Sequence, residues 1–106
     1  LPHLKALDYP GQSLSVAFYE VMGLRSVEVG SVMLGSRDPK TGIETPAPKE
    51  LVRLAIPRRV YTQSHADYVV ETILAVHERR SRLRGLRIVR EPQALRHFTA
   101  AFSPLD

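Results

Sequence analysis

Arg53 is the residue whose type and position most directly suggest chemistry. A strand over residues 50–56 would place Arg53 between Leu51 and Ala55 on one face. A guanidinium buried among apolar side chains requires an anion, and its planar fork fits a carboxylate through two parallel hydrogen bonds. The carboxylate could belong to a substrate or to the protein itself, and an exposed strand face would also accommodate the arginine. The spacing alone leaves these three interpretations open.

The other ionisable residues form no recognisable metal or catalytic motif. The chain has 4 histidines and 11 acidic residues, but no pair has metal-ligand spacing and no His-Glu-x-x-His run occurs. His77, on the apolar side of a predicted helix, is interpreted as a packed core residue rather than a ligand. The sequence also lacks a glycine-rich phosphate loop and a Gly-x-Ser-x-Gly elbow, so nucleotide binding and serine hydrolysis have no local support.

A basic stretch at residues 79–84 raises nucleic-acid binding as another interpretation. The chain carries 15 Lys and Arg residues against 11 Asp and Glu, a net charge of +4. The stretch falls where a helix is predicted to end, and cations there complement the helix dipole. Because no aromatic residue interleaves with it to stack on bases, a solvated helix end is favoured.

The composition is that of one small globular domain. The chain has 106 residues, 43% apolar and 25% charged, enough for one modest core. No apolar run approaches the roughly 20 residues that cross a bilayer, and the first residues show no secretory signal. The absence of cysteine excludes disulfides and thiolate metal sites and fits a reducing compartment. We therefore expect a cytoplasmic protein that does not enter a membrane.

The elements that would position Arg53 follow from hydrophobic periodicity. A helix is predicted over residues 13–22, with Ser13 as N-cap and Gly23 beyond its end. A strand is predicted over residues 24–34, with Val27 and Val29 on one face and Gly30 marking a bulge or a close backbone approach. Residues 35–48 are predicted to form a long loop before the strand at 50–56.

The second half is predicted to contain the main helix, residues 65–82, starting at a Ser64–Asp67 capping box. Its apolar stripe would be Ala66, Val69, Val70, Ile73, Leu74 and His77. Gly85 would close this helix, and strands at 86–89 and 96–102 would flank a turn at 91–95. The resulting fold class is α+β, a small mostly antiparallel sheet with two helices on one face.

Five sequence blocks carry a family resemblance. They are residues 25–31, 34–42, 50–58, 61–65 and 91–100. In this order they resemble the C-terminal end of tryptophanases, members of the β-eliminating lyase family. Tyrosine phenol-lyases, the sister family, are similar around Arg53 and in the Glu-Pro-Gln run at 91–93. The blocks cover nearly the whole chain, and their common order is far more specific than any single motif.

The resemblance implies a fold-type-I pyridoxal-phosphate enzyme, in which a small domain closes over a cofactor held mainly by a large domain. Residues 1–106 would be the C-terminal small domain, without the cofactor-binding large domain. Arg53 matches the arginine that clamps the carboxylate of the amino-acid substrate. Such a clamp orients the bond to be broken relative to the cofactor ring.

The resemblance also implies a substrate. Where this chain has Val27 and Val29, the phenol-lyases carry a methionine and an arginine, and that arginine faces the phenol hydroxyl. Two valines form an apolar wall that suits an indole and penalises an unpaired hydroxyl. His97 matches a tryptophanase histidine where the phenol-lyases have phenylalanine, and Phe98 would be a neighbouring wall. Together they imply cleavage of L-tryptophan to indole, pyruvate and ammonia.

Half of such a site is missing from this sequence. The family's Schiff-base lysine lies in the large domain, and none of Lys5, Lys40 and Lys49 matches it. The chain alone is therefore expected to have no catalytic or cofactor-binding residue, to bind no pyridoxal phosphate or metal, and to be inactive. The expected partners are the amino-acid substrate, the large domain and further copies of the whole enzyme, with no nucleic acid and no membrane.

Two alternatives stay open. A carbon–sulfur lyase acting on cysteine or a cysteine conjugate, including one inside a biosynthetic megasynthase such as a polyketide synthase, would use the same clamp. A non-catalytic binding module could have kept the fold, with the basic helix end as its binding patch.

Overall fold

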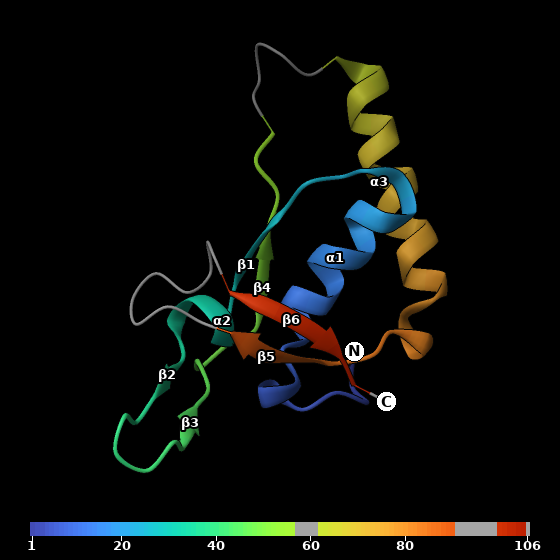
Figure 1. Ribbon diagram of the computed structural model, residues 1–106. Helices are drawn as coiled ribbons and strands as arrows, with labels where there is room; N and C mark the ends of the chain where they lie inside the picture. The colour runs from blue at the N-terminus through green and yellow to red at the C-terminus, as the bar shows by residue number, and fades with distance from the viewer. Residues whose placement is uncertain (57–61, 91–99, 106) are drawn as a thin grey trace.

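The computed structural model describes residues 1–56, 62–90 and 100–105, and combines helices with short strands (Figure 1). The helical elements are η1 (Ala6–Asp8), α1 (Pro10–Met22), α2 (Ser31–Leu34), α3 (Gln63–Glu78) and η2 (Arg80–Arg82). The strands are β1 (Val27–Val29), β2 (Ser36–Arg37), β3 (Glu44–Thr45), β4 (Leu51–Arg53), β5 (Leu86–Arg90) and β6 (Ala101–Pro104). The α+β class predicted from the sequence is confirmed.

The described strands pair antiparallel, as expected. The partners are β1 with β4, β2 with β3, and β5 with β6, so these strands form three two-stranded ladders rather than one continuous sheet. Helix α1 contacts β1 and β4 and also β5, and thereby connects two of the ladders (Figure 1). The domain is therefore organised around this helix.

Helix α1 begins three residues before its predicted start and ends where predicted. Pro10 occupies its first turn, where a missing N–H costs no helical hydrogen bond and the fixed φ is favourable. Gly23 follows the helix at φ 71°, a left-handed conformation that glycine adopts without a Cβ clash. Its N–H donates to the Tyr19 carbonyl at 2.7 Å, and the prediction that Gly23 terminates the helix is confirmed.

Helix α3 confirms the main predicted helix but corrects both of its ends. Its N-cap is Thr62, whose hydroxyl accepts from the His65 N–H at 3.4 Å while His65 Nδ1 accepts from the Thr62 N–H at 3.0 Å. The predicted capping box at Ser64 and Asp67 is therefore wrong. The N-cap is two residues earlier, and the ring nitrogen of His65 accepts the hydrogen bond that an acidic side chain was expected to accept. At the other end the α-helix stops at Glu78, and the 3-10 turn η2 follows.

The buried stripe of α3 is rotated relative to the predicted one. Its buried residues are Val69, Thr72 and Val76. The apolar residues Val70, Ile73 and Leu74 are exposed, and so is His77, so the prediction of a packed core histidine is wrong. Thr72 was overlooked because it is polar; its hydroxyl donates to the Tyr68 carbonyl at 2.9 Å, which satisfies it inside the core.

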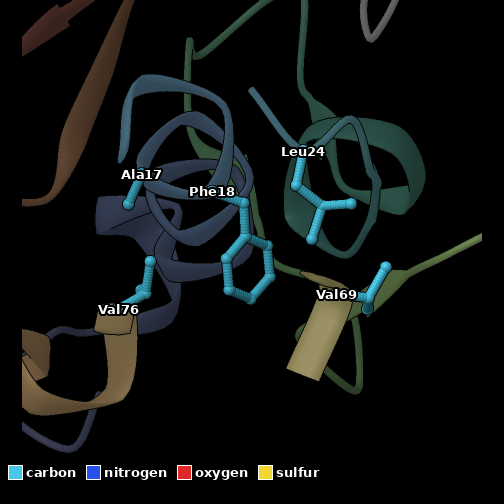
Figure 2. Close-up of a cluster of buried hydrophobic side chains, with 5 residues drawn as sticks. All are labelled: Ala17, Phe18, Leu24, Val69 and Val76. Carbon is cyan, nitrogen blue, oxygen red and sulfur yellow. The ribbon is translucent and has the colours of Figure 1, made fainter. Parts of the chain in front are cut away.

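The core joins the two long helices to the strand that carries Arg53. Figure 2 shows the Phe18 ring of α1 among Leu24, Val69 and Val76, with Ala17 beside it on the helix. The partly buried residues packed against this cluster are Leu14, Val21, Val52, Leu54 and Leu83. Because Val52 belongs to β4, both α1 and α3 lie on the side of the β1–β4 ladder that Val52 faces. The expected placement of two helices on one face holds for this ladder.

Several predicted boundaries in the strand regions change. The strand predicted over 24–34 is reduced to β1, since residues 31–34 form α2, and the predicted loop at 35–48 contains the β2–β3 hairpin. Strand β5 extends one residue beyond its prediction. Strand β6 overlaps the predicted strand only at residues 101 and 102, while residues 96–99 of that prediction and the turn at 91–95 lie outside the described residues.

Candidate functional site

The β1–β4 ladder brings together three of the five predicted site residues. Its antiparallel register places Val27 opposite Arg53, Glu28 opposite Val52, and Val29 opposite Leu51. Since successive side chains of a strand point to opposite faces, these pairs divide the ladder into two faces. We call the face of Val27, Val29, Leu51 and Arg53 the outer face, and the face of Glu28 and Val52 the inner face. The other two predicted site residues, His97 and Phe98, lie outside the described residues.

The outer face is open in this structure. Val27 is 39% exposed, Leu51 is 51% exposed, and Arg53 is also exposed. Arg53 is therefore not buried among Leu51 and Ala55, and β4 ends before Ala55 is reached. Among the residues that the structure describes, no carboxylate forms an ion pair with Arg53. Of the three interpretations left open by the spacing, the exposed strand face is the arrangement of this chain.

The inner face carries a buried carboxylate that accepts hydrogen bonds from backbone N–H groups. Glu28 is only 4% exposed, and its oxygens accept from the backbone N–H groups of Gly30 at 2.7 Å, Val32 at 2.8 Å and Met33 at 3.2 Å. These amides belong to the first turn of α2 and its N-cap, whose N–H groups have no partner within the helix. Glu28 therefore anchors the chain that leaves β1.

A second carboxylate reaches the same turn from the other strand. Glu50, the residue before β4, accepts from the Ser31 N–H at 3.1 Å and from the Ser31 hydroxyl. The Ser31 hydroxyl oxygen in turn accepts from the Ala47 N–H at 3.0 Å. We call Glu28, Gly30, Ser31 and Glu50 the carboxylate clip, because they join the end of β1 to the start of β4.

Gly30 allows the clip to close. A Cβ on Gly30 would lie 3.0 Å from the Glu50 Cδ and would overlap its carboxylate oxygen. The predicted close backbone approach at Gly30 is thus confirmed. Hydrophobic periodicity gave no indication of Glu28 and Glu50. For Glu28 the available signal was an acid two residues before a Gly-Ser pair, a pattern suited to capping a helical turn. No local signal marked Glu50.

Within the described part of the chain, no lysine is placed to hold pyridoxal phosphate beside the outer face. Lys5, Lys40 and Lys49 are all exposed, and none lies on the outer face. Elsewhere, an open groove of about 530 Å³ is lined by α1 and the chain before β1, and there the Arg25 guanidinium lies 5.5 Å from the centre of the Tyr19 ring. Among the described residues no group of histidines and acids could hold a metal ion, and no helix is long and apolar enough to cross a membrane.

Comparison with known proteins identifies relatives along almost the entire chain. No protein-family model matches. The chain is 58% identical over 105 residues to the tryptophanase of Hyphomonas neptunium, and 59% identical over 104 residues to that of Salinibacter ruber. It is 51% identical over 100 residues to the tryptophanase of Escherichia coli O157:H7. These alignments cover 99%, 98% and 94% of this chain but only 23%, 22% and 21% of the relatives.

Fold and site together define a small α+β domain that presents one open strand face bearing an arginine. The chain is homologous to tryptophanases along nearly its whole length, corresponds to their C-terminal small domain, and spans a little over a fifth of their length. The resemblance carried by the five sequence blocks is confirmed.

Proposed function

We propose that this chain is the substrate-binding small domain of a β-eliminating lyase that cleaves L-tryptophan to indole, pyruvate and ammonia. In this proposal the outer face forms one wall of the substrate site, and Arg53 binds the carboxylate of the amino acid. The observation that carries the proposal is the register that sets Arg53 directly opposite Val27 on an open face. A charged group for the carboxylate and an apolar surface for the side chain thus lie side by side.

The geometry of Arg53 suits this role. Its guanidinium is exposed and, among the described residues, forms no ion pair with a carboxylate, so an external anion has no internal competitor there. A carboxylate accepts two parallel hydrogen bonds from the planar fork, which fixes its orientation as well as its position. That orientation is what the cleavage of a bond in an amino acid requires from its binding site.

The apolar neighbours of Arg53 support an indole side chain. Val27 and Val29 offer no hydrogen-bond partner, so a hydroxyl-bearing ring placed against them would lose its bonds to water without replacement. His97 and Phe98 remain predictions for the same site. A carbon–sulfur lyase would use the same clamp, which is why sulfur substrates belong in the test.

The remaining machinery would come from the rest of the protein. The chain offers no enclosed lysine for pyridoxal phosphate, so we assign the cofactor to the missing large domain and expect this chain alone to be inactive and to bind none. We also expect the whole enzyme to be a cytoplasmic homo-oligomer.

The test is Arg53→Ala in the full-length protein that carries this segment. We expect about 100-fold weaker binding of L-tryptophan, roughly 2.7 kcal/mol, because the carboxylate loses a bidentate charged partner. Binding of the decarboxylated analogue tryptamine should hardly change. Arg87→Ala, which removes an exposed arginine of β5, is the matched control. Unchanged binding of both L-tryptophan and S-substituted cysteines in Arg53→Ala would overturn the proposal, and preferred cleavage of the cysteines by the unmodified enzyme would reassign the substrate.

A further inference from the structure

We infer that Glu28 and Glu50 are positioning residues, which fix the place where Arg53 presents its guanidinium. This inference rests on the function proposed above, and it assigns a role to two carboxylates that do not themselves touch the substrate. The argument starts from the weakness of the ladder that carries Arg53.

The β1–β4 ladder is too short to set its own register firmly. It consists of three residue pairs, and an isolated two-stranded ladder is marginal in water. A slip of one residue would turn every side chain of one strand to the opposite face. Arg53 would then point toward α1 and its place on the outer face would be taken by an apolar neighbour. Contacts outside the ladder must therefore hold the register.

Glu28 fixes which way β1 faces. Its carboxylate is held on the inner side by three backbone N–H groups, at 2.7, 2.8 and 3.2 Å. Gly11 of α1 approaches the same side chain, since a Cβ on Gly11 would lie 3.1 Å from the Glu28 Cγ. Because Glu28 is anchored inward, its neighbours Val27 and Val29 must point outward.

Glu50 fixes the position of β4 along β1. Its carboxylate binds Ser31, two residues after Val29, through the Ser31 N–H at 3.1 Å and the Ser31 hydroxyl. Leu51 follows Glu50 directly and pairs with Val29, and Arg53 comes two residues later on the same face. The bond between Glu50 and Ser31 thus sets the register that brings Arg53 opposite Val27.

Gly30 offers a way to open the clip without changing charge. A methyl group there would overlap the Glu50 carboxylate, which ends a flexible side chain and would swing away from Ser31. Glu50→Gln is the complementary variant. It keeps the size of the side chain and turns an amide NH2 toward donors that need an acceptor.

A structural role and a positioning role predict different couplings to Arg53. If the clip only stabilises the fold, its loss should affect every ligand and should do so whether or not Arg53 is present. If the clip positions Arg53, its loss should affect only ligands with a carboxylate and should have no further effect once the guanidinium is gone. A double-mutant cycle separates the two.

The experiment measures binding of L-tryptophan and of tryptamine to the full-length protein. The variants are Gly30→Ala, Glu50→Gln and Glu28→Gln, each made in the unmodified and in the Arg53→Ala background. We expect on the order of 10-fold weaker L-tryptophan binding in the first background, because a small displacement of a clamp is costly, and less than about twofold in the second. Tryptamine binding should stay the same throughout. Glu71→Gln, which removes the same charge from an exposed position of α3, should change nothing.

The outcomes are distinguishable. If the clip variants weaken L-tryptophan binding equally in both backgrounds, or weaken tryptamine binding as much, the carboxylates are structural and the inference is overturned. If Arg53→Ala by itself leaves the preference for L-tryptophan over tryptamine unchanged, the proposed function is overturned, and the inference that rests on it is overturned with it. Should Gly30→Ala not fold, the cycle with Glu50→Gln, which keeps the shape of the side chain, decides the matter.

Discussion

The inner and outer faces of the β1–β4 ladder are built from neighbouring residues but have opposite surroundings. On the inner face, Glu28 is 4% exposed with three hydrogen bonds, and Val52 packs against the core cluster. On the outer face, Val27 and Leu51 are 39% and 51% exposed and form two adjoining cross-strand pairs with Arg53 and Val29. Each of the two three-residue strands thus packs one face against the rest of the domain and leaves the other face open.

The difference means that burial in the core explains the residue types of the inner face but not those of the outer face. Exposed apolar side chains are common on protein surfaces, and on the outer face Val27 and Leu51 add no contact to the core cluster. The residues of the inner face can be explained within this chain. In the function proposed above, those of the outer face serve a contact made within a longer protein.

The largest expected effect tests the core behind the inner face. Phe18→Ala should lower the free energy of unfolding by about 3–5 kcal/mol, because it removes the ring at the centre of the cluster in Figure 2. Leu74→Ala removes an exposed apolar side chain of α3 and should cost less than about 0.5 kcal/mol. Urea denaturation followed by circular dichroism measures both. Equal losses would mean that the face of α3 bearing Leu74 is buried in solution and that this core is incomplete.

A smaller effect compares the two faces directly, on adjacent residues of β4. Val52→Ala should cost about 1 kcal/mol, since it removes partly buried methyl groups from the core. Leu51→Ala removes a larger side chain from the outer face and should cost less than about 0.5 kcal/mol. The same denaturation experiment applies. A larger loss for Leu51→Ala would invert the assignment of inner and outer faces.

The smallest effect concerns Asp38, in the hairpin away from both faces. The Lys40 N–H donates to its carboxylate at 2.8 Å, and this bond lowers the pKa of Asp38 below its ordinary value of 3.8. A group with a lowered folded pKa contributes stability above its unfolded pKa and loses that contribution as the pH falls through the folded pKa. An NMR titration of the Asp38 side chain should therefore give a midpoint below 3.8, with outer-face resonances unmoved. A midpoint at or above 3.8 would show that the turn is not closed by this bond.

Local sequence signals predicted the parts of the fold that depend only on interactions between residues close together in the chain. The end of α1 at Gly23 follows from backbone conformation, and the alternation of Val27 and Val29 follows from the pleat. The pairing of Val27 with Arg53 was not predictable, because register depends on contacts between distant segments. Helix α2 was missed for the same reason: a carboxylate of β1 and one preceding β4 supply its partners.

The buried stripe of α3 shows a second limit of pattern reading. Counting apolar residues selects Val70, Ile73 and Leu74, yet Thr72 is the residue that is buried, and a bond within the helix satisfies its hydroxyl there. The sequence contains two overlapping apolar stripes, and only packing against α1 selects one. His97 and Phe98 remain predictions of the candidate site.

Helix α1 has a consequence for the order in which this domain assembles. It contacts β1, β4, α3 and β5, segments that begin as near as residue 27 and end as far as residue 90. Contacts between residues so far apart in sequence close large loops and slow folding. We therefore expect the outer face to form late in folding, after the distant segments have packed against α1. During synthesis, the outer face would therefore depend on a helix that precedes both of its strands and packs on the opposite face of the ladder.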